Sequence, residues 1–271
     1  MSRSHRLLGV CAIAGSVAAF PASASAPART TISISGSTSV APLTAKLIRG
    51  YLRAFPGSVS FRLAQGGSDV GVADVARGRV TIGDSSRDPK PTDPGGIVFN
   101  KIARDAICIA THSSNPVKNL SQAQIQAIFG GRIRNWSQIP GSGVTGTINI
   151  VVRTAASGTQ DAFDKIFMGS TRVSSSAAQK ASNGLVAQAI RSDPNAIGYV
   201  SLAFTNGLND AQYKGVGCTL RNAKSGQYEG TRNFWMVTRG RAIGAARRFI
   251  FWINNSRSAS AIIANGWVPL R

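Results

Sequence analysis

The chain has 271 residues, of which 43% are hydrophobic and 15% charged, a composition typical of globular and not of disordered proteins. Its formal net charge of +20 predicts attraction to anions such as phosphate, nucleic acid, an acidic cell-wall polymer or an anionic membrane surface. It has no long block of Lys and Arg and no recognisable DNA-binding motif, so nucleic acid is not an expected partner.

Residues 1–26 have the features of a secretory signal. Arg3 and Arg6 form a basic start, an apolar run follows from Leu7 to Phe20, and the small residues 24–26 fit a cleavage site. The run is too short and too rich in Ala, Gly and Ser to be a convincing membrane span. We therefore expect an exported protein, periplasmic or extracellular, that is soluble after cleavage and carries about +18.

Strands, polar turns and helices alternate through the first half of the mature chain. Alternating apolar residues predict three strands, at 31–35, 59–63 and 80–82. Apolar residues at helical spacing predict two helices, at 42–52 and 72–76. Turns rich in glycine and hydroxyl residues follow the strands, at 36–39, 66–71 and 83–89. This alternation predicts a doubly wound α/β sheet, in which ligands bind at the carboxyl ends of the strands.

The second half continues the same alternation with longer connections. Ser121 and Gln124 form a capping box before a helix that ends at Gly130. The pattern predicts further strands at 106–110, 196–200 and 234–237, and further helices at 184–190, 243–253 and 259–264. We expect 170–182 to be an exposed polar connection and 214–230 to be loop-rich.

The stretch 148–163 has the pattern of a strand, a tight turn and a helix start. Ser157 is a good N-cap, Thr159 adds a hydroxyl donor, and Gly158 allows close approach of the backbone. Arg153 adds a guanidinium that can bind an oxyanion through two nitrogens. Because a helix start carries unpaired N–H groups and partial positive charge, the stretch suits a small oxyanion. An ordinary capped helix with a surface arginine is the alternative.

Four turns rich in glycine and hydroxyl residues follow strands, and two of them contain an arginine: 37–39, 66–69, 84–87 and 153–159. On one α/β pattern they predict a convergent anion site. The mature chain has a single histidine, His112, and two cysteines, so we expect no metal site. In an oxidising compartment Cys108 and Cys218 can form a disulfide, or they can remain two buried thiols.

Several motifs together resemble one protein family. The motifs are Ser35-Gly36-Ser37-Thr38-Ser39, Gly66-Gly67-Ser68, Ile82-Gly83-Asp84-Ser85-Ser86-Arg87, Arg153-x-x-x-Ser157-Gly158-Thr159, Ile128-Phe129-Gly130-Gly131 with Asn135-Trp136, and Ala196-Ile197-Gly198-Tyr199. In this order they are similar to the phosphate-binding proteins of bacterial ABC importers. The resemblance covers nearly all of the mature chain.

The resemblance implies a type II periplasmic-binding-protein fold, with two α/β lobes, each a doubly wound sheet, joined by two hinge strands. Lobe 1 would comprise 27–108 and 235–271, and lobe 2 would comprise 109–234. A disulfide between Cys108 and Cys218 would then tie the crossing strand to lobe 2.

The same resemblance implies the residues that hold phosphate between the lobes. They are Thr38, Ser39, Ser68, Ser86, Arg87, Arg153, Ser157, Gly158 and Thr159. Some relatives have an aspartate, which accepts the proton of the ligand, where this chain has Arg87. A site made only of donors would suit sulfate as well as hydrogen phosphate, so an acceptor is needed for selectivity. Asp69 and Asp84 are the candidates for this acceptor.

The predicted function is therefore capture of inorganic phosphate and delivery to the membrane permease of an ABC importer, by a monomer without a cofactor. Receptors for sulfate or molybdate are the closest alternative. A secreted phosphate-ester hydrolase is a further alternative, which the sequence opposes because it has no Gly-x-Ser-x-Gly motif and only His112 for a catalytic relay. Retention on acidic cell-wall polymer would be compatible with transport.

Overall fold

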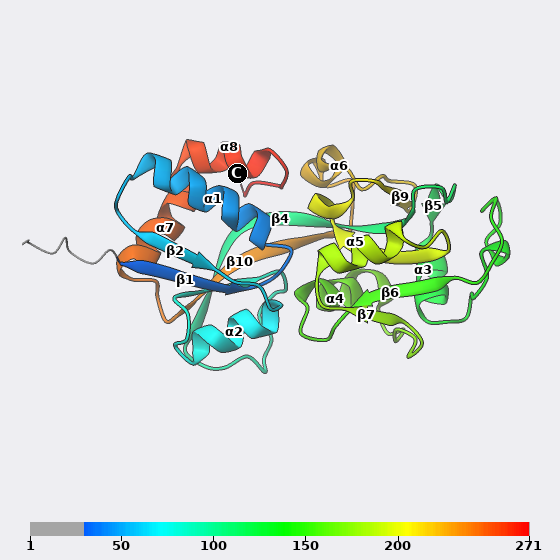
Figure 1. Ribbon diagram of the computed structural model, residues 1–271, viewed down its shortest axis with the longest axis horizontal. Coiled ribbons are helices and arrows are strands. Elements are labelled where there is room, and N and C mark those ends of the chain that lie inside the picture. Colours follow the sequence, from blue (N-terminus) through cyan, green and yellow to red (C-terminus); the bar gives the residue numbers. More distant parts are fainter. Residues whose placement is uncertain (1–29, 271) are drawn as a thin grey trace, which may run out of the picture.

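The computed structural model describes residues 30–270, so the expected signal at 1–26 lies outside the described residues. The molecule is elongated and its elements form two groups along the long axis (Figure 1). The first group contains β1 (Thr31–Gly36), α1 (Ala41–Ala54), β2 (Ser60–Leu63), α2 (Ser68–Ala76), β3 (Ile82–Ser85), α7 (Gly244–Asn255) and α8 (Arg257–Ala264).

The second group contains the middle of the chain. Its strands are β5 (Asn119–Leu120), β6 (Asn149–Arg153), β7 (Ala178–Lys180), β8 (Ala196–Ser201) and β9 (Leu208–Tyr213). Its helices are α3 (Gln122–Phe129), α4 (Gly158–Phe163), α5 (Asn183–Arg191) and α6 (Leu220–Ser225), with short helical turns at Trp136–Gln138, Asp164–Met168 and Leu202–Phe204. Two long strands, β4 (Ile97–His112) and β10 (Thr231–Arg239), run between the groups (Figure 1).

One continuous sheet path passes through both groups, in the order β2-β1-β3-β10-β4-β8-β6-β7. Pairs β1–β2, β1–β3, β6–β8 and β6–β7 are parallel, whereas β10 is antiparallel to both β3 and β4. Strand β4 pairs with β10 up to Ala106 and with β8 from Ile107 onward. The path therefore changes from one group to the other within β4.

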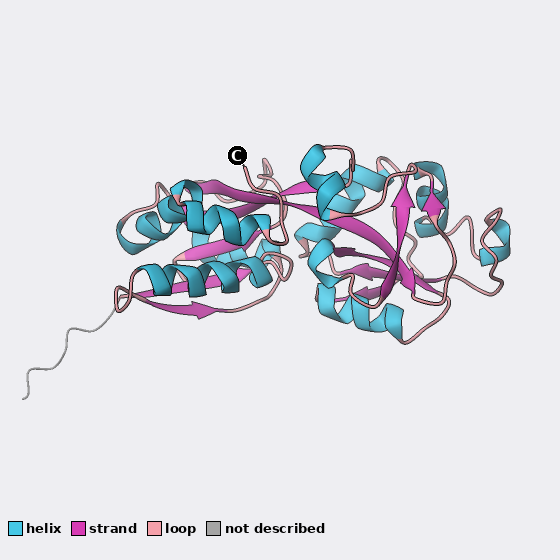
Figure 2. Ribbon diagram, turned by 90° about the horizontal axis from the view of Figure 1, so that it is seen from above, coloured by secondary structure: helices cyan, strands magenta, loops and turns pink. Residues whose placement is uncertain are grey.

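Helices cover both faces of the sheet in each group, as Figure 2 shows in the view from above. In the first group, Leu43 and Leu47 of α1 pack with α7 and α8 on one face, while Val72 and Val75 of α2 pack on the other. In the second group, the α3 and α4 side holds the large core around Phe163, and α5 covers the opposite face. The observed architecture is a mixed α/β fold with helices on both faces of one sheet path, consistent with the alternation in the sequence.

Local sequence signals explain several of these elements. Pro42 lies in the first turn of α1, where its missing N–H is not needed. The capping box of Ser121 and Gln124 begins α3, as predicted. The Ser157 hydroxyl accepts the N–H groups of Thr159 and Gln160 and so caps α4, also as predicted.

Three segments differ from the pattern in the sequence. The strand expected at 80–82 lies instead at Ile82–Ser85. Its bounds are determined by its pairing with β1 and β10 and not by its own apolar residues. The polar connection 170–182 contains β7, an edge strand whose partly exposed residues carry no apolar alternation. The stretch 214–230 contains α6, which has Thr219 as its N-cap.

Cys108 of β4 and Cys218 form a disulfide, with their Cα atoms 5.5 Å apart, in the large core of the second group. Within residues 30–270, no helix combines the length and the apolar character that crossing a membrane requires.

Candidate functional site

The hydroxyl-rich turns of the two groups meet at one place. We call Ser37, Thr38, Ser39, Ser68, Ser86 and Thr159 the hydroxyl cluster. Its members lie in the turn before α1, in the first turn of α2, directly after β3 and in the first turn of α4. Three helix starts therefore converge on the cluster, and their free N–H groups make it a place of positive potential.

The cluster is tightly connected and excluded from solvent. Ser39 Oγ lies 2.9 Å from Thr159 Oγ1, and Ser37 Oγ donates to Ser86 Oγ at 2.9 Å. Ser68 Oγ lies 3.3 Å from Ser86 Oγ. None of the six residues is more than 5% exposed. Hydroxyl groups buried at this density need partners, and an anion with several oxygens can accept from all of them.

Arg153 supplies a buried positive charge beside the cluster. Its side chain donates to the carbonyl oxygens of Lys180 and Ala181 at 3.2 and 2.8 Å, and Nη1 lies 3.4 Å from Thr159 Oγ1. Among the described residues it has no carboxylate within salt-bridge distance, although it is only 2% exposed. Burial lowers the pKa of Arg153 to about 10, with Tyr199 opposing the shift and repulsion from Arg232 adding to it, so the side chain remains charged at neutral pH. A buried cation without an anionic partner is costly, and a bound anion relieves that cost.

Arg87, in contrast, is already neutralised. Its guanidinium donates to Asp69 and twice to Asp93, with each carboxylate 2.5 Å away at the closest pair of atoms. Burial alone would lower the pKa of Arg87, but the hydrogen bonds and charges of Asp93 and Asp69 raise it. The guanidinium therefore points into an ion-pair network, and the backbone N–H of Arg87 donates to Ser85 Oγ at 3.3 Å.

The two candidate proton acceptors lie in different surroundings. The Asp69 carboxylate is 39% exposed and paired with Arg87. Asp84 is 1% exposed, accepts a hydrogen bond from Thr44 at 2.8 Å, and has a second oxygen without a partner among the described atoms. Burial raises its pKa to about 7, and the bond from Thr44 opposes this shift. No hydrogen bond between the described residues joins either carboxylate to the hydroxyl cluster.

Gly158 allows the two groups to approach each other. A Cβ at this position would lie 2.8 Å from Arg87 N and from Ser86 Oγ, and closer still to Ser68 Oγ. Any larger residue would push α4 away from the first group.

One buried residue of the site was not predicted from the sequence. Asn183, the first residue of α5, is 0% exposed and its amide nitrogen lies 3.1 Å from Thr38 Oγ1 and 3.2 Å from Ser39 Oγ. Nothing local distinguishes this asparagine, because its partners are about 145 positions away in the sequence.

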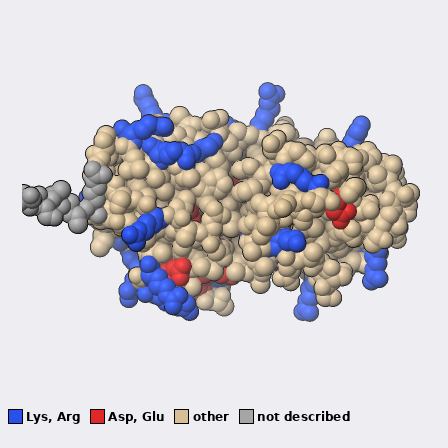
Figure 3. Space-filling view, in the orientation of Figure 1, with Lys and Arg blue, Asp and Glu red and all other residues tan. Residues whose placement is uncertain are grey.

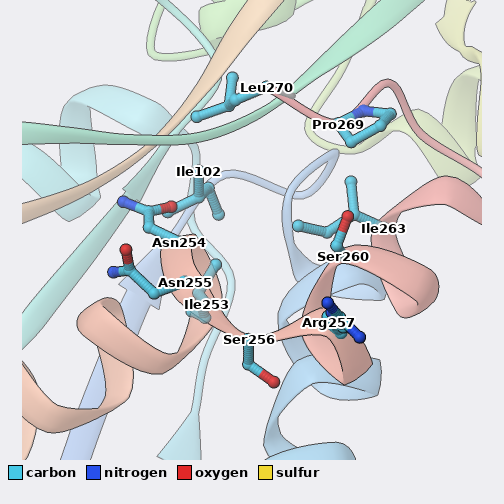
Figure 4. A pocket seen from close by; sticks show the side chains of 10 residues that line it. All are labelled: Ile102, Ile253, Asn254, Asn255, Ser256, Arg257, Ser260, Ile263, Pro269 and Leu270. Carbon is cyan, nitrogen blue, oxygen red and sulfur yellow. The ribbon is translucent and has the colours of Figure 1, made fainter.

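The chemistry of the site favours an oxyanion as its ligand. Within the described part of the chain, no group of three His, Cys, Asp or Glu residues could hold a metal ion. A cavity of about 280 Å³, lined by Ser86, Arg87, Lys165, Arg232 and neighbouring residues, borders the cluster between the groups. A separate cavity of about 330 Å³ lies near the junction of α7 and α8 and shares no residue with the cluster (Figure 4). The cluster itself presents donors and positive charge, which suit an oxyanion.

Helices on both faces of the sheet and an oxyanion site between two groups of elements define a solute-binding protein of the periplasmic-binding-protein (PBP) class. The sequence model of the PBP superfamily domain matches residues 21–256. The crystal structure of a phosphate ABC transporter substrate-binding protein with bound phosphate from Clostridium perfringens is 30% identical, with a TM-score of 0.84, and the match covers 89% of this chain and 100% of that chain. This chain belongs to the PBP superfamily and, within it, to the PstS family of phosphate-binding proteins of phosphate ABC transporters.

Two further relatives agree with this assignment. The phosphate-binding protein PstS of Bacillus subtilis (strain 168) is 25% identical over 245 residues, which are 88% of this chain and 80% of that protein. The ABC-type phosphate transport receptor from Vibrio cholerae is 26% identical with a TM-score of 0.70, and the match covers 88% of this chain and 99% of that chain.

Proposed function

We propose that this protein binds inorganic phosphate between its two groups of elements and delivers it to the membrane permease of an ABC importer. It is a transport receptor and not an enzyme. One observation carries the proposal: Arg153 is buried without a carboxylate partner beside a cluster of buried hydroxyls at helix starts. Phosphate loses its hydration shell when it enters the site, and the charge-assisted hydrogen bonds made there replace those that water supplied.

The proposed ligand set follows from the site. Thr38, Ser39, Ser68, Ser86 and Thr159 donate through hydroxyls, Arg153 through its guanidinium and Gly158 through its backbone N–H. Arg87 supports the set from the side through its ion pairs with Asp69 and Asp93. Ser157 belongs to the set as well: its hydroxyl oxygen accepts two N–H groups as the cap of α4, which leaves its O–H to donate to phosphate.

The two groups of elements act as the two lobes, and β4 and β10 as the hinge strands. The pairing of β4 changes between Ala106 and Ile107, and β10 begins at Thr231. These positions favour boundaries at 106/107 and 230/231, a few residues before those expected from the resemblance. Closure about two strands would order both halves of the site around one ion.

Asp84 is the better candidate for the proton acceptor. Its carboxylate is buried near the start of α1 and keeps one oxygen free, whereas the Asp69 carboxylate is held by Arg87. An ionised acceptor rewards the proton of hydrogen phosphate and rejects sulfate, which has no proton at neutral pH.

Isothermal titration of phosphate-stripped protein with phosphate, arsenate and sulfate tests the function. We expect tight binding of phosphate and arsenate and weaker binding of sulfate. Tighter binding of sulfate or molybdate would identify a receptor for another oxyanion, and no heat with phosphate would contradict the proposal. A chromogenic phosphate ester should release no product, because His112 bonds Ser114 at the far end of β4 and no hydrogen bond joins it to the cluster.

Export places the receptor where it meets external phosphate, and we propose that the mature protein is periplasmic or held at the cell wall as a monomer. Lys and Arg side chains are spread over the face shown in Figure 3, with few Asp or Glu among them. Such a surface suits weak retention on acidic wall polymer, which added salt would release.

A further inference from the structure

The Asn183 side chain links the two groups of elements across the site. It belongs to α5 of the second group, and its amide nitrogen contacts Thr38 Oγ1 at 3.1 Å and Ser39 Oγ at 3.2 Å in the first group. Its backbone N–H also points to Thr38 Oγ1 at 3.4 Å. The residue is 0% exposed, so these contacts are made without competition from water.

The orientation of the Asn183 amide is fixed by its other end. Its side-chain oxygen accepts the backbone N–H of Ser201 at 3.0 Å. Because a backbone N–H can only donate, the oxygen of the amide must face Ser201 and the NH₂ group must face the two hydroxyls. The amide is therefore a double donor toward Thr38 and Ser39.

This arrangement sets the direction of the hydroxyl hydrogens. An oxygen that accepts from Asn183 has its own O–H left to donate elsewhere. Thr38 and Ser39 are thereby arranged as donors toward a bound anion. Arg153 Nη1 likewise donates to Thr159 Oγ1 at 3.4 Å. Donors of the second group therefore set the direction of the hydroxyl hydrogens in both halves of the site.

We propose that Asn183 is a positioning residue that holds the lobes closed and fixes Thr38 and Ser39 as donors to phosphate. The inference rests on the proposed function and adds to it a residue that sets the residence time of the bound anion. Its contacts bridge the lobes and exist only when they are together, so their loss accelerates release and leaves capture unchanged.

Two substitutions separate these effects. Asn183→Ala removes both donors, and we expect the Kd for phosphate to rise about tenfold, almost entirely through faster dissociation. Asn183→Asp keeps the acceptor for the Ser201 N–H but replaces the NH₂ donor by a second acceptor oxygen. Thr38 and Ser39 would then donate to this oxygen instead of to the anion, and its negative charge would repel the anion. We expect its Kd to rise at least a hundredfold at pH 8. Stopped-flow release and titration with phosphate measure both.

Controls on the same helix distinguish positioning from structural support. Gln188 is exposed on α5, so Gln188→Ala and Gln188→Glu make matched changes of size and charge and should keep wild-type binding. Lowering the pH returns a proton to the new carboxylate, so the ratio of the Asn183→Asp Kd to the wild-type Kd should fall from pH 8 to pH 5. A role in folding alone would change the ligand-free melting temperature without this pH dependence.

The outcomes are distinct. Wild-type dissociation rates in both variants would overturn the inference, and so would equal losses in the two variants with lowered melting temperatures and no pH dependence. Failure of the wild-type protein itself to bind phosphate would instead overturn the proposed function and, with it, this inference.

Discussion

Ser39 Oγ lies 2.9 Å from Thr159 Oγ1, although the two residues are 120 positions apart and belong to different groups of elements. Both are fully buried, and each lies in the turn or first residues that begin a helix. Because the two halves of the site meet through hydroxyls, the strength of anion binding depends on the charge beside them. That charge is carried by Arg153.

Arg153→Ala should abolish measurable phosphate binding, with a loss of at least about a hundredfold, since charge-assisted hydrogen bonds to an anion contribute about 1.5–3 kcal/mol each. Arg153→Lys keeps the charge but not the planar pair of donors, so it should recover only part of the affinity. Titration calorimetry measures both. Arg132 is exposed in the second group of elements, and Arg132→Ala is the matched control that should bind as wild type does. Normal binding by Arg153→Ala would contradict the assigned site.

Asp84 should make stability depend on pH. Its folded pKa of about 7 lies above the ordinary aspartate value of 3.8, so its contribution is complete below about pH 4 and is lost as the pH rises through 7. The free energy of unfolding should therefore fall by at most about 4 kcal/mol over that range. Asp84→Asn should flatten this slope, measured by denaturant unfolding at several pH values. Asp210, whose pKa burial also raises to about 7, leaves a residual slope in the variant.

The two candidate acceptors can be compared directly in phosphate and sulfate. Asp84→Asn should reduce the preference for phosphate over sulfate. The carboxylate has two acceptor oxygens, whereas the amide has only one and lacks the negative charge that attracts the proton of hydrogen phosphate. Asp69→Asn should leave that preference unchanged, because Arg87 holds the Asp69 carboxylate. A selective loss in the Asp69 variant alone would reverse the assignment.

Sequence patterns predicted the parts of the fold whose physical signals are local. The stripe of Leu43 and Leu47 predicted α1, and the caps of Ser121 and Ser157 predicted two helix starts. Strand β9 and the first half of β4 were missed, because their pairing with distant strands determines them more than their own residue pattern does. An edge strand such as β7 lacks the apolar residues that would reveal it.

The candidate site shows the same division. Hydroxyl turns after strands predicted the members of the cluster that lie at helix starts. The direction of the Arg87 guanidinium was not predictable, because it depends on Asp93, which no motif connects to the site. The part played by Asn183 depends on a contact between α5 and the turn before α1, which only the folded arrangement provides.

The disulfide should stabilise the fold without contributing to binding. It joins residues 110 positions apart and lies in the core of the second group of elements, apart from the hydroxyl cluster. Replacing both Cys108 and Cys218 by serine should lower the stability by about 2–5 kcal/mol. Guanidinium unfolding and phosphate titration of the double variant measure the two quantities. A large rise in Kd at a temperature where the variant is folded would show that the disulfide also orders the site.

Gly158→Ala should weaken phosphate binding without destabilising the ligand-free protein. Alanine is a good helix residue, so α4 should still form, but the added Cβ would meet Ser86 Oγ and the backbone nitrogen of Arg87 at 2.8 Å. The two lobes of the proposed mechanism could then not close fully. We expect the Kd for phosphate to rise about a hundredfold, which corresponds to a loss of about 3 kcal/mol of binding free energy. Gly184 is the matched control near the start of α5, because a Cβ there would meet only Ser182 Oγ at 3.8 Å. Equal affinities in the Gly158 and Gly184 variants would mean that the lobes do not close over the anion at α4.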